Sequence, residues 1–222
     1  MEKIKELNNT LSHRLKQEME DSKKTLINLD SKYPEINIVK QKILDFDMEE
    51  FENNIFNLLE NKLIIEWVKY QSKEDVEQYD MIYFEYHEQS HEYSEALSYG
   101  IFDMKEYQLT IDSHDFGYDY KFSYWEAGLG IDLEPFKLTE PIGYSNLNDD
   151  DYFDLISYKD SNSGYDQIWN TINTICRYAL HRSFKKTDVL GLFEPLKIKK
   201  GGLFSYDMHD NGMILIPFYI KG

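Results

Sequence analysis

Apolar and aromatic residues recur at every second position through the middle of the chain. Three runs show this alternation: residues 82–86, 107–111 and 118–124. A period of two is typical of strands that have one buried face and one wetter face. Short breaks that contain Ser, Gly and Asp separate the runs. The pattern therefore predicts an antiparallel meander of about four strands within residues 79–144.

The chain before this region has the spacing of amphipathic helices. Leucine and isoleucine side chains three and four positions apart predict a first helix, which should end before Pro34. Asp47 and Glu50 have the spacing of a capping box, which predicts a second helix to about Tyr70. We therefore expect residues 1–71 to form an N-terminal helical hairpin that is laid against the sheet.

A third helix and a final hairpin are predicted in the last part of the chain. Ser163 stands before an apolar stripe that predicts a helix over residues 163–186. The Asn211-Gly212 pair lies between two alternating segments and predicts a β-hairpin over residues 203–220. Pro217 places its second strand at a sheet edge, or ends the strand nearby.

The segment between the meander and the third helix has no regular pattern. Repeated Gly and Pro residues predict extended pieces and turns over residues 126–144. Residues 146–154, which include three consecutive aspartates, are expected to form a solvated loop. Helices, then strands, then a helix and a hairpin define an α+β fold class with a mainly antiparallel sheet. We expect one domain, residues 1–222, in which this sheet packs with the helical hairpin and the later helix.

Composition agrees with a folded protein. Hydrophobic residues make up 41% of the chain and aromatic residues 15%, which argues against disorder. The single Cys176 cannot form an internal disulfide and is expected in the core. The first residues are charged, and the longest apolar run, residues 213–220, is far shorter than the roughly 20 residues that span a bilayer. We therefore expect a soluble, cytoplasmic protein.

Charge is distributed unevenly along the chain. Residues 72–160 hold 22 acidic and 5 basic side chains, a net charge of −17, which equals the net charge of the whole chain. Residues 1–71 carry a net charge of −3, and residues 161–222 a net charge of +3. A field of negative sign repels nucleic acid and anionic membranes and attracts basic surfaces. The alternative is that the charge serves only solubility.

One motif, HExxH at residues 87–91, matches the zinc site of many metalloproteases. On a helix, His87 and His91 would share one face, and Glu88 would activate the metal-bound water. The third ligand would have to come from Glu92, Glu95 or Asp103. However, the residues that lead into the motif alternate as a strand does, and residues four apart in a strand or turn do not converge on one metal. We therefore expect no cofactor and no catalytic residues, with the zinc site kept as an alternative.

An acidic, tyrosine-rich sheet without a catalytic motif favours a binding function. Tyrosine supplies rigid amphipathic contact area, and the surrounding carboxylates steer a cationic partner toward it. We expect the protein to neutralise a basic protein partner, for example a toxin domain, and to bind neither nucleic acid nor a membrane. The predicted partner-binding residues are Asp112, Asp115, Tyr118, Asp119, Tyr120, Asp149, Asp150 and Asp151.

Bacterial immunity proteins, which block the active sites of cognate toxins, resemble this chain in type. They are commonly small, cytosolic, acidic and free of catalytic motifs, and no shared motif supports the resemblance beyond this. Two alternatives remain at this point: a zinc-dependent hydrolase that uses His87 and His91, and a structural or interaction module without catalysis. The oligomeric state is left open.

Overall fold

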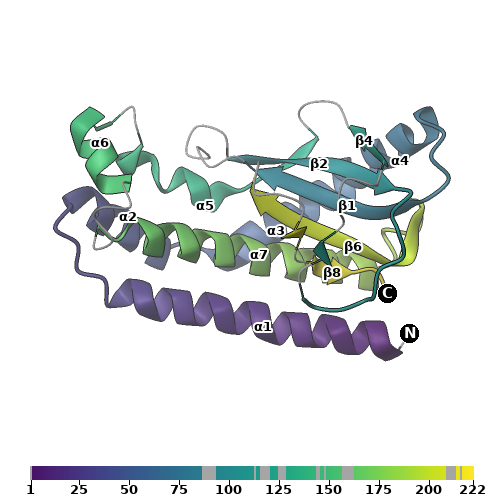
Figure 1. The fold of residues 1–222 in the computed structure, drawn as a ribbon, viewed down its shortest axis with the longest axis horizontal. Helices are drawn as coiled ribbons and strands as arrows, with labels where there is room; N and C mark the ends of the chain where they lie inside the picture. Colours follow the sequence, from purple (N-terminus) through teal and green to yellow (C-terminus); the bar gives the residue numbers. More distant parts are fainter. Residues whose placement is uncertain are drawn as a thin grey trace.

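A sheet lies on a layer of helices, and both are built from segments far apart in the sequence (Figure 1). In this computed structural model, α3 (Met48–Leu58) and α7 (Tyr165–Val189) lie beneath the sheet, and α1 (Glu2–Ile27) packs along α7. The fold class is α+β with a mostly antiparallel sheet, which confirms the prediction. The structure describes residues 2–86, 94–112, 114–115, 121–124, 129–143, 146–147, 149–156, 163–208, 214–215 and 217–222.

The N-terminal region is helical, as predicted, but an additional helix lies between the two predicted ones. The additional helix is α2 (Pro34–Leu44), which buries Ile36, Val39 and Ile43. Pro34 occupies the first turn of this helix, where its missing N–H costs nothing, so this proline begins a helix as well as following one. Asp47 caps α3 by accepting hydrogen bonds from two backbone N–H groups, both at 3.0 Å. A π-helical turn, η1 (Leu59–Leu63), then leads into α4 (Ile64–Lys73).

The sheet has the strand order β4-β2-β1-β6-β8, and β5 also pairs with β2. The strands β1 and β2 are antiparallel, with Met81 opposite Ile101. In contrast, β1 and β6 are parallel, a pairing that the sequence pattern did not predict. A separate pair joins β3 to β7. The bounds are β1 Tyr79–Tyr86, β2 Glu95–Phe102, β3 His114–Asp115, β4 Lys121–Tyr124, β5 Gly130–Asp132, β6 Ile198–Met208, β7 Ile214–Leu215 and β8 Pro217–Ile220.

The antiparallel strands of the predicted C-terminal hairpin are confirmed, since β8 runs antiparallel to β6 and forms an edge of the sheet, and the predicted Asn211-Gly212 turn lies outside the described residues. Pro217 therefore lies on an edge strand, where a missing N–H is tolerated. The predicted strand over residues 107–111 is wrong, because residues 104–110 form no regular secondary structure. Their apolar side chains instead pack, together with Ile4 and Leu11 of α1, against Met81 and Ile101 on the sheet face opposite the main core. Every second side chain of this segment is apolar because it packs on the sheet face, although the segment does not pair as a strand.

Residues 134–156 also differ from the prediction of extended pieces and a solvated loop. They contain the short helix α5 (Glu134–Lys137), a 3₁₀ turn, η2 (Glu140–Ile142), and the helix α6 (Asp149–Ile156). Prolines stand in the first turns of α5 and η2, where their fixed backbone angle suits a helix. The consecutive aspartates open α6, and acidic side chains there suit the positive end of the helix dipole.

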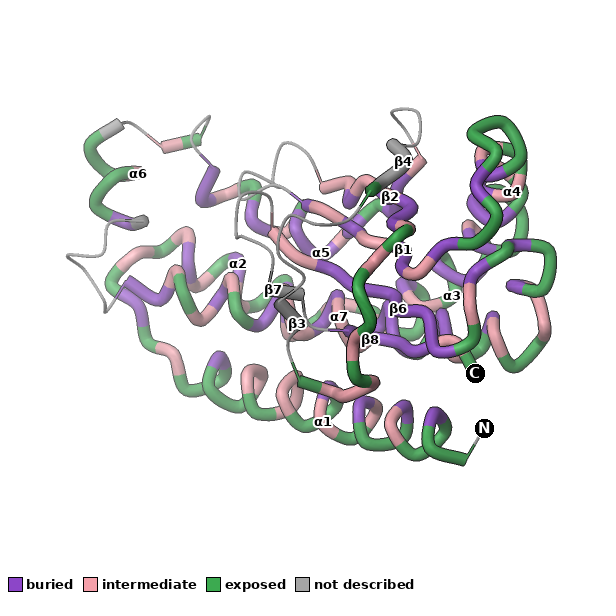
Figure 2. The backbone as a smooth tube through the Cα atoms, turned by 45° about the vertical axis from the view of Figure 1, so that its right-hand side comes forward, coloured by how far each residue is buried: buried purple, intermediate pink, exposed green. Residues whose placement is uncertain are grey.

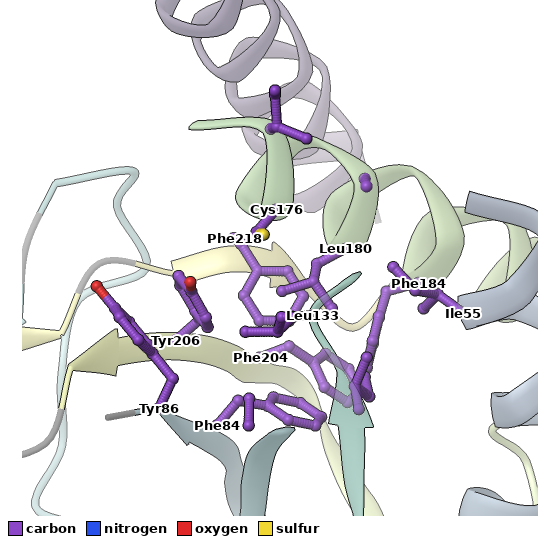
Figure 3. Close-up of a cluster of buried hydrophobic side chains, with 14 of the residues drawn as sticks. Ile55, Phe84, Tyr86, Leu133, Cys176, Leu180, Phe184, Phe204, Tyr206 and Phe218 are labelled. Atoms are coloured by element: carbon purple, nitrogen blue, oxygen red, sulfur yellow. The ribbon is translucent and has the colours of Figure 1, made fainter. Parts of the chain in front are cut away.

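The main hydrophobic core lies between α7 and the sheet. Phe84, Phe184, Phe204 and Phe218 meet there with ring centroids 4.7–6.3 Å apart, and all four are fully buried (Figure 3). The buried stretches of β1, β6 and α7 face one another, whereas α6 and the outer side of α1 are exposed (Figure 2). The predicted third helix is thus the centre of the core. None of the helices in the described residues combines the length and the apolar character that crossing a bilayer requires.

Candidate binding surface

The predicted partner-binding residues fall in different parts of the fold. Asp112 is exposed at the end of the irregular segment that follows β2, and its backbone N–H donates to Thr110 Oγ1 at 3.1 Å. Asp115 belongs to β3, where its backbone lies opposite Ile214 of β7. Tyr118, Asp119 and Tyr120 lie outside the described residues, so their predicted role stays a prediction.

The three consecutive aspartates are placed apart from Asp112. Asp149, Asp150 and Asp151 form the first turn of α6, and the last two are exposed. Figure 1 shows α6 at one end of the molecule and the segment that follows β2 toward the other. The helix is held by Leu155, which is buried, while Phe153 next to the acidic turn is 57% exposed. Asp112 and the three aspartates of α6 therefore do not lie in one compact patch.

The sheet face opposite the main core, part of which α1 covers, carries tyrosine and acidic side chains, but at other positions than the predicted ones. Tyr83 of β1 and Tyr99 of β2 stack across the two strands, with ring centroids 6.0 Å apart. The hydroxyl of Tyr99 donates to Glu85 Oε2 at 3.1 Å. Asp207 of β6 is the register partner of Glu85, so two carboxylates stand side by side beside the two rings. All four side chains are half-buried.

Three other tyrosines of the sheet belong to the main core. Tyr86, Tyr206 and Tyr219 are each at most 6% exposed. Burial raises the pKa of all three hydroxyls, because the apolar surroundings disfavour a phenolate. Within residues 82–86 the alternation therefore divides the tyrosines: Tyr86 is in the core and Tyr83 lies on the opposite face of the sheet.

The irregular segment that follows β2 packs on the same sheet face as the N-terminal part of α1. The backbone N–H of Met104 donates to Asp80 Oδ2 at 3.0 Å, and Lys199 lies 4.5 Å from the centroid of the Tyr107 ring. Lys199 also forms an ion pair with Asp80. Leu109 sits over Gly201, which has a φ of +81° in the bulged part of β6. These contacts fix the exposed acids Glu106 and Asp112 above the sheet.

Two basic side chains of α7 are used within the helical layer. Arg182 of α7 lies 2.9 Å from Glu52, and Lys186 lies 3.8 Å from the centroid of the Phe56 ring. Both line a cleft between α1, α3 and α7, on the side of the molecule away from the sheet. Neither contact involves an acidic side chain of residues 72–160.

A serine and a histidine meet in the core, but their geometry does not favour catalysis. Ser12 Oγ and His181 Nε2 are 2.5 Å apart, and His181 Nδ1 contacts the carbonyl oxygen of Phe218. Because that carbonyl only accepts, Nδ1 carries the proton and Nε2 accepts from the serine. Burial lowers the pKa of His181 to about 4, which makes it a weak base at neutral pH. Ser12 lies inside α1, whose backbone N–H groups bond within the helix and offer no oxyanion site.

The zinc alternative falls mostly outside the described residues. His87 and His91 lie there, so the structure does not test their pairing. The preceding prediction is confirmed, because β1 runs as a strand through Tyr86, directly before the motif. Within the described ranges, no three His, Cys, Asp or Glu side chains gather in a way that would hold a metal ion.

The fold defines an α+β protein in which one sheet face packs on α7, and the other carries Tyr83 and Tyr99 and is partly covered by α1. Searches against known proteins add no name to this class: no family model, no curated protein and no solved structure matches the chain.

Proposed function

We propose that this protein is a non-catalytic, cytoplasmic binding protein that neutralises a basic protein partner, in the manner of a bacterial immunity protein acting on a toxin. The observation that supports this proposal is the outward sheet face, where Tyr83 and Tyr99 stack beside Glu85 and Asp207. Stacked tyrosines give a rigid contact area that loses little conformational entropy on binding. The neighbouring carboxylates complement lysine and arginine side chains of a partner.

Electrostatics supports the same proposal at longer range. The segment that follows β2 packs on the same cluster as the tyrosine pair and carries the exposed acids Glu106 and Asp112. A concentrated negative field raises the association rate of a cationic protein, and salt weakens this effect. Binding should therefore be fast at low salt, and salt should change the association rate more than the dissociation rate.

The test uses the full chain as bait in an extract of its source cells, with bound proteins eluted by salt and identified by mass spectrometry. We expect a partner with a basic binding domain, whose association rate falls steeply between about 50 and 500 mM NaCl. Retention of no basic protein, or an association rate that is indifferent to salt, would contradict the proposal.

Charge-reversal variants locate the surface. The double variant Glu106→Lys/Asp112→Lys should lower the association rate by about tenfold or more, because it removes steering on the proposed face. The matched control is Glu60→Lys, which changes an exposed acid in η1, in the helical layer. If the double variant and the control lower the association rate equally per charge changed, the partner does not bind at the proposed face.

A further inference from the structure

Two arginine side chains from different helices share one carboxylate. Arg14 Nε of α1 lies 3.6 Å from Glu18 Oε1, and Arg177 Nη1 of α7 lies 3.4 Å from Glu18 Oε2. The arginine side chains are 27% and 19% exposed, so most of each is removed from solvent. Two guanidinium groups against one carboxylate leave one positive charge uncompensated within this group.

Several donors of these arginines are buried and make no hydrogen bond with any of the described residues. They are Nε and Nη2 of Arg14 and Nη2 of Arg177. A buried donor of a charged group that makes no hydrogen bond costs free energy, and folded proteins rarely leave such donors unsatisfied. Burial also lowers the pKa of Arg177, with Glu18 acting against this shift and Arg14 adding to it. The arrangement is therefore unfavourable as it stands and would become favourable with an anion.

The neighbouring polar groups lie at one end of the sheet. Asn173, one turn before Arg177 in α7, has its Oδ1 3.1 Å from the hydroxyl of Tyr206. Tyr86 stacks on Tyr206 with ring centroids 4.6 Å apart. Figure 3 shows both hydroxyls on the same side, directed away from the phenylalanine core. The parallel strands β1 and β6 both end here, and the carboxyl ends of parallel strands are where open sheets commonly bind ligands.

We propose that Arg14 and Arg177 bind a small oxyanion, a carboxylate or phosphate group, between α1 and α7. The guanidinium fork matches the paired oxygens of both groups, and the unpartnered donors come from two helices, so one anion would satisfy donors of both. The remaining positive charge selects against cations. In contrast, Arg182 Nε lies 2.9 Å from Glu52 Oε2, so the charge of Arg182 is already paired with a carboxylate. This site is independent of the proposed partner-binding face.

The test is calorimetric titration of the full chain with inorganic phosphate and, separately, with acetate, at an ionic strength held constant with NaCl. We expect saturable binding of at least one anion, and a rise in the thermal unfolding midpoint that follows its occupancy. Binding of phosphate alone would identify a phosphate site, binding of acetate alone a carboxylate site, and binding of both a general oxyanion site.

Variants separate a specific site from diffuse charge. Arg14→Gln and Arg177→Gln should each weaken binding by about tenfold or more, because each removes charge-assisted hydrogen bonds. Arg14→Lys keeps the charge but loses the fork, and should also bind more weakly. Arg182→Gln is the matched control and should bind as the unchanged protein does. Arg14→Gln without anion should be as stable as the unchanged protein or more stable, since it removes unsatisfied donors.

Two results would overturn the proposal. One is the absence of saturable binding of either anion up to about 50 mM, a concentration at which even a weak site of this kind would fill. The other is an equal loss of affinity in Arg182→Gln and Arg14→Gln, which would show that the anion senses only overall charge. If Arg177→Gln does not fold, Arg14→Gln and Arg14→Lys decide the outcome, because Arg14 lies on the more exposed helix.

Discussion

The side-chain amide of Asn8 in α1 forms two hydrogen bonds with the backbone of Ile220 in β8, although 212 positions separate the two residues. Asn8 Nδ2 donates to the carbonyl oxygen at 2.7 Å, and the Ile220 N–H donates to Asn8 Oδ1 at 3.0 Å. The amide thus takes the place of a neighbouring strand at the edge of the sheet. Gln71 of α4 repeats the arrangement with both backbone groups of Lys197, at 2.8 and 2.9 Å.

We expect Asn8→Ala to lower the free energy of unfolding by about 1–3 kcal/mol, because it leaves the N–H and carbonyl of Ile220 buried and unpaired. Urea unfolding followed by circular dichroism measures the change. The control is Asn9→Ala on the exposed side of the same helix, where the effect should stay within about 0.5 kcal/mol. If both variants lose the same stability, the edge pairing contributes nothing beyond helix propensity.

Cys176 provides an independent probe of the core. Its thiol is fully buried on α7, and burial raises its pKa, so both access and thiolate fraction are low. We expect no reaction with an aromatic disulfide reagent under native conditions, and one reacting thiol per chain in denaturant. The native labelling rate should follow the rate of unfolding. Rapid, complete labelling of the native protein would show that α7 does not pack on the sheet as described.

The HExxH motif makes a prediction about metal content. Because β1 remains a strand up to Tyr86, we expect the protein to hold far less than one zinc ion per chain when it is purified without added metal. Elemental analysis by mass spectrometry measures this ratio. Near-stoichiometric zinc that is lost in His91→Ala, but kept in the exposed-site variant His13→Ala, would instead support the hydrolase alternative.

Local patterns predicted the elements whose boundaries depend on nearby residues. The cap at Asp47, the hairpin strand at Pro217 and the strand that contains Phe84 all appear in the structure. The helix that begins at Pro34 was missed because a proline stops one helix and starts another with the same residue. The alternation at residues 107–111 was misassigned because a segment that packs across a sheet face can bury every second side chain without pairing.

The candidate sites were harder to predict than the fold. Tyr83 and Glu85 stand at the odd positions of an alternating run, so the pattern separates them from the core residues but does not say which face the helices cover. The parallel pairing of β1 with β6, which brings Asp207 beside Glu85, depends on where α7 returns the chain. The contact between Glu18 and Arg177 spans 159 positions and leaves no signal in a single sequence.

His181 makes the stability of the protein depend on pH. Its pKa is lowered from 6.5 to about 4, first by burial and then by Lys185 and Arg182, while its contact with the Phe218 carbonyl acts in the opposite direction. Above pH 6.5 the imidazole is neutral in both the folded and the unfolded chain, and it carries no penalty. As the pH falls, the unfolded chain takes up a proton first, so the free energy of unfolding decreases until the folded imidazole also titrates near pH 4.

The loss between pH 6.5 and pH 4 should total about 3 kcal/mol, since each unit of the pKa difference corresponds to about 1.4 kcal/mol. Urea unfolding at a series of pH values measures this loss.

The carboxylates of this acidic chain titrate in part of the same range, so the His181 contribution is the difference between the unchanged protein and His181→Gln. That variant should be less stable at neutral pH but should lose less stability on acidification. His13→Gln, which replaces an exposed histidine of α1, should keep the full slope. Equal slopes in the unchanged protein and in His181→Gln would mean that the imidazole is not held neutral between Ser12 and Phe218.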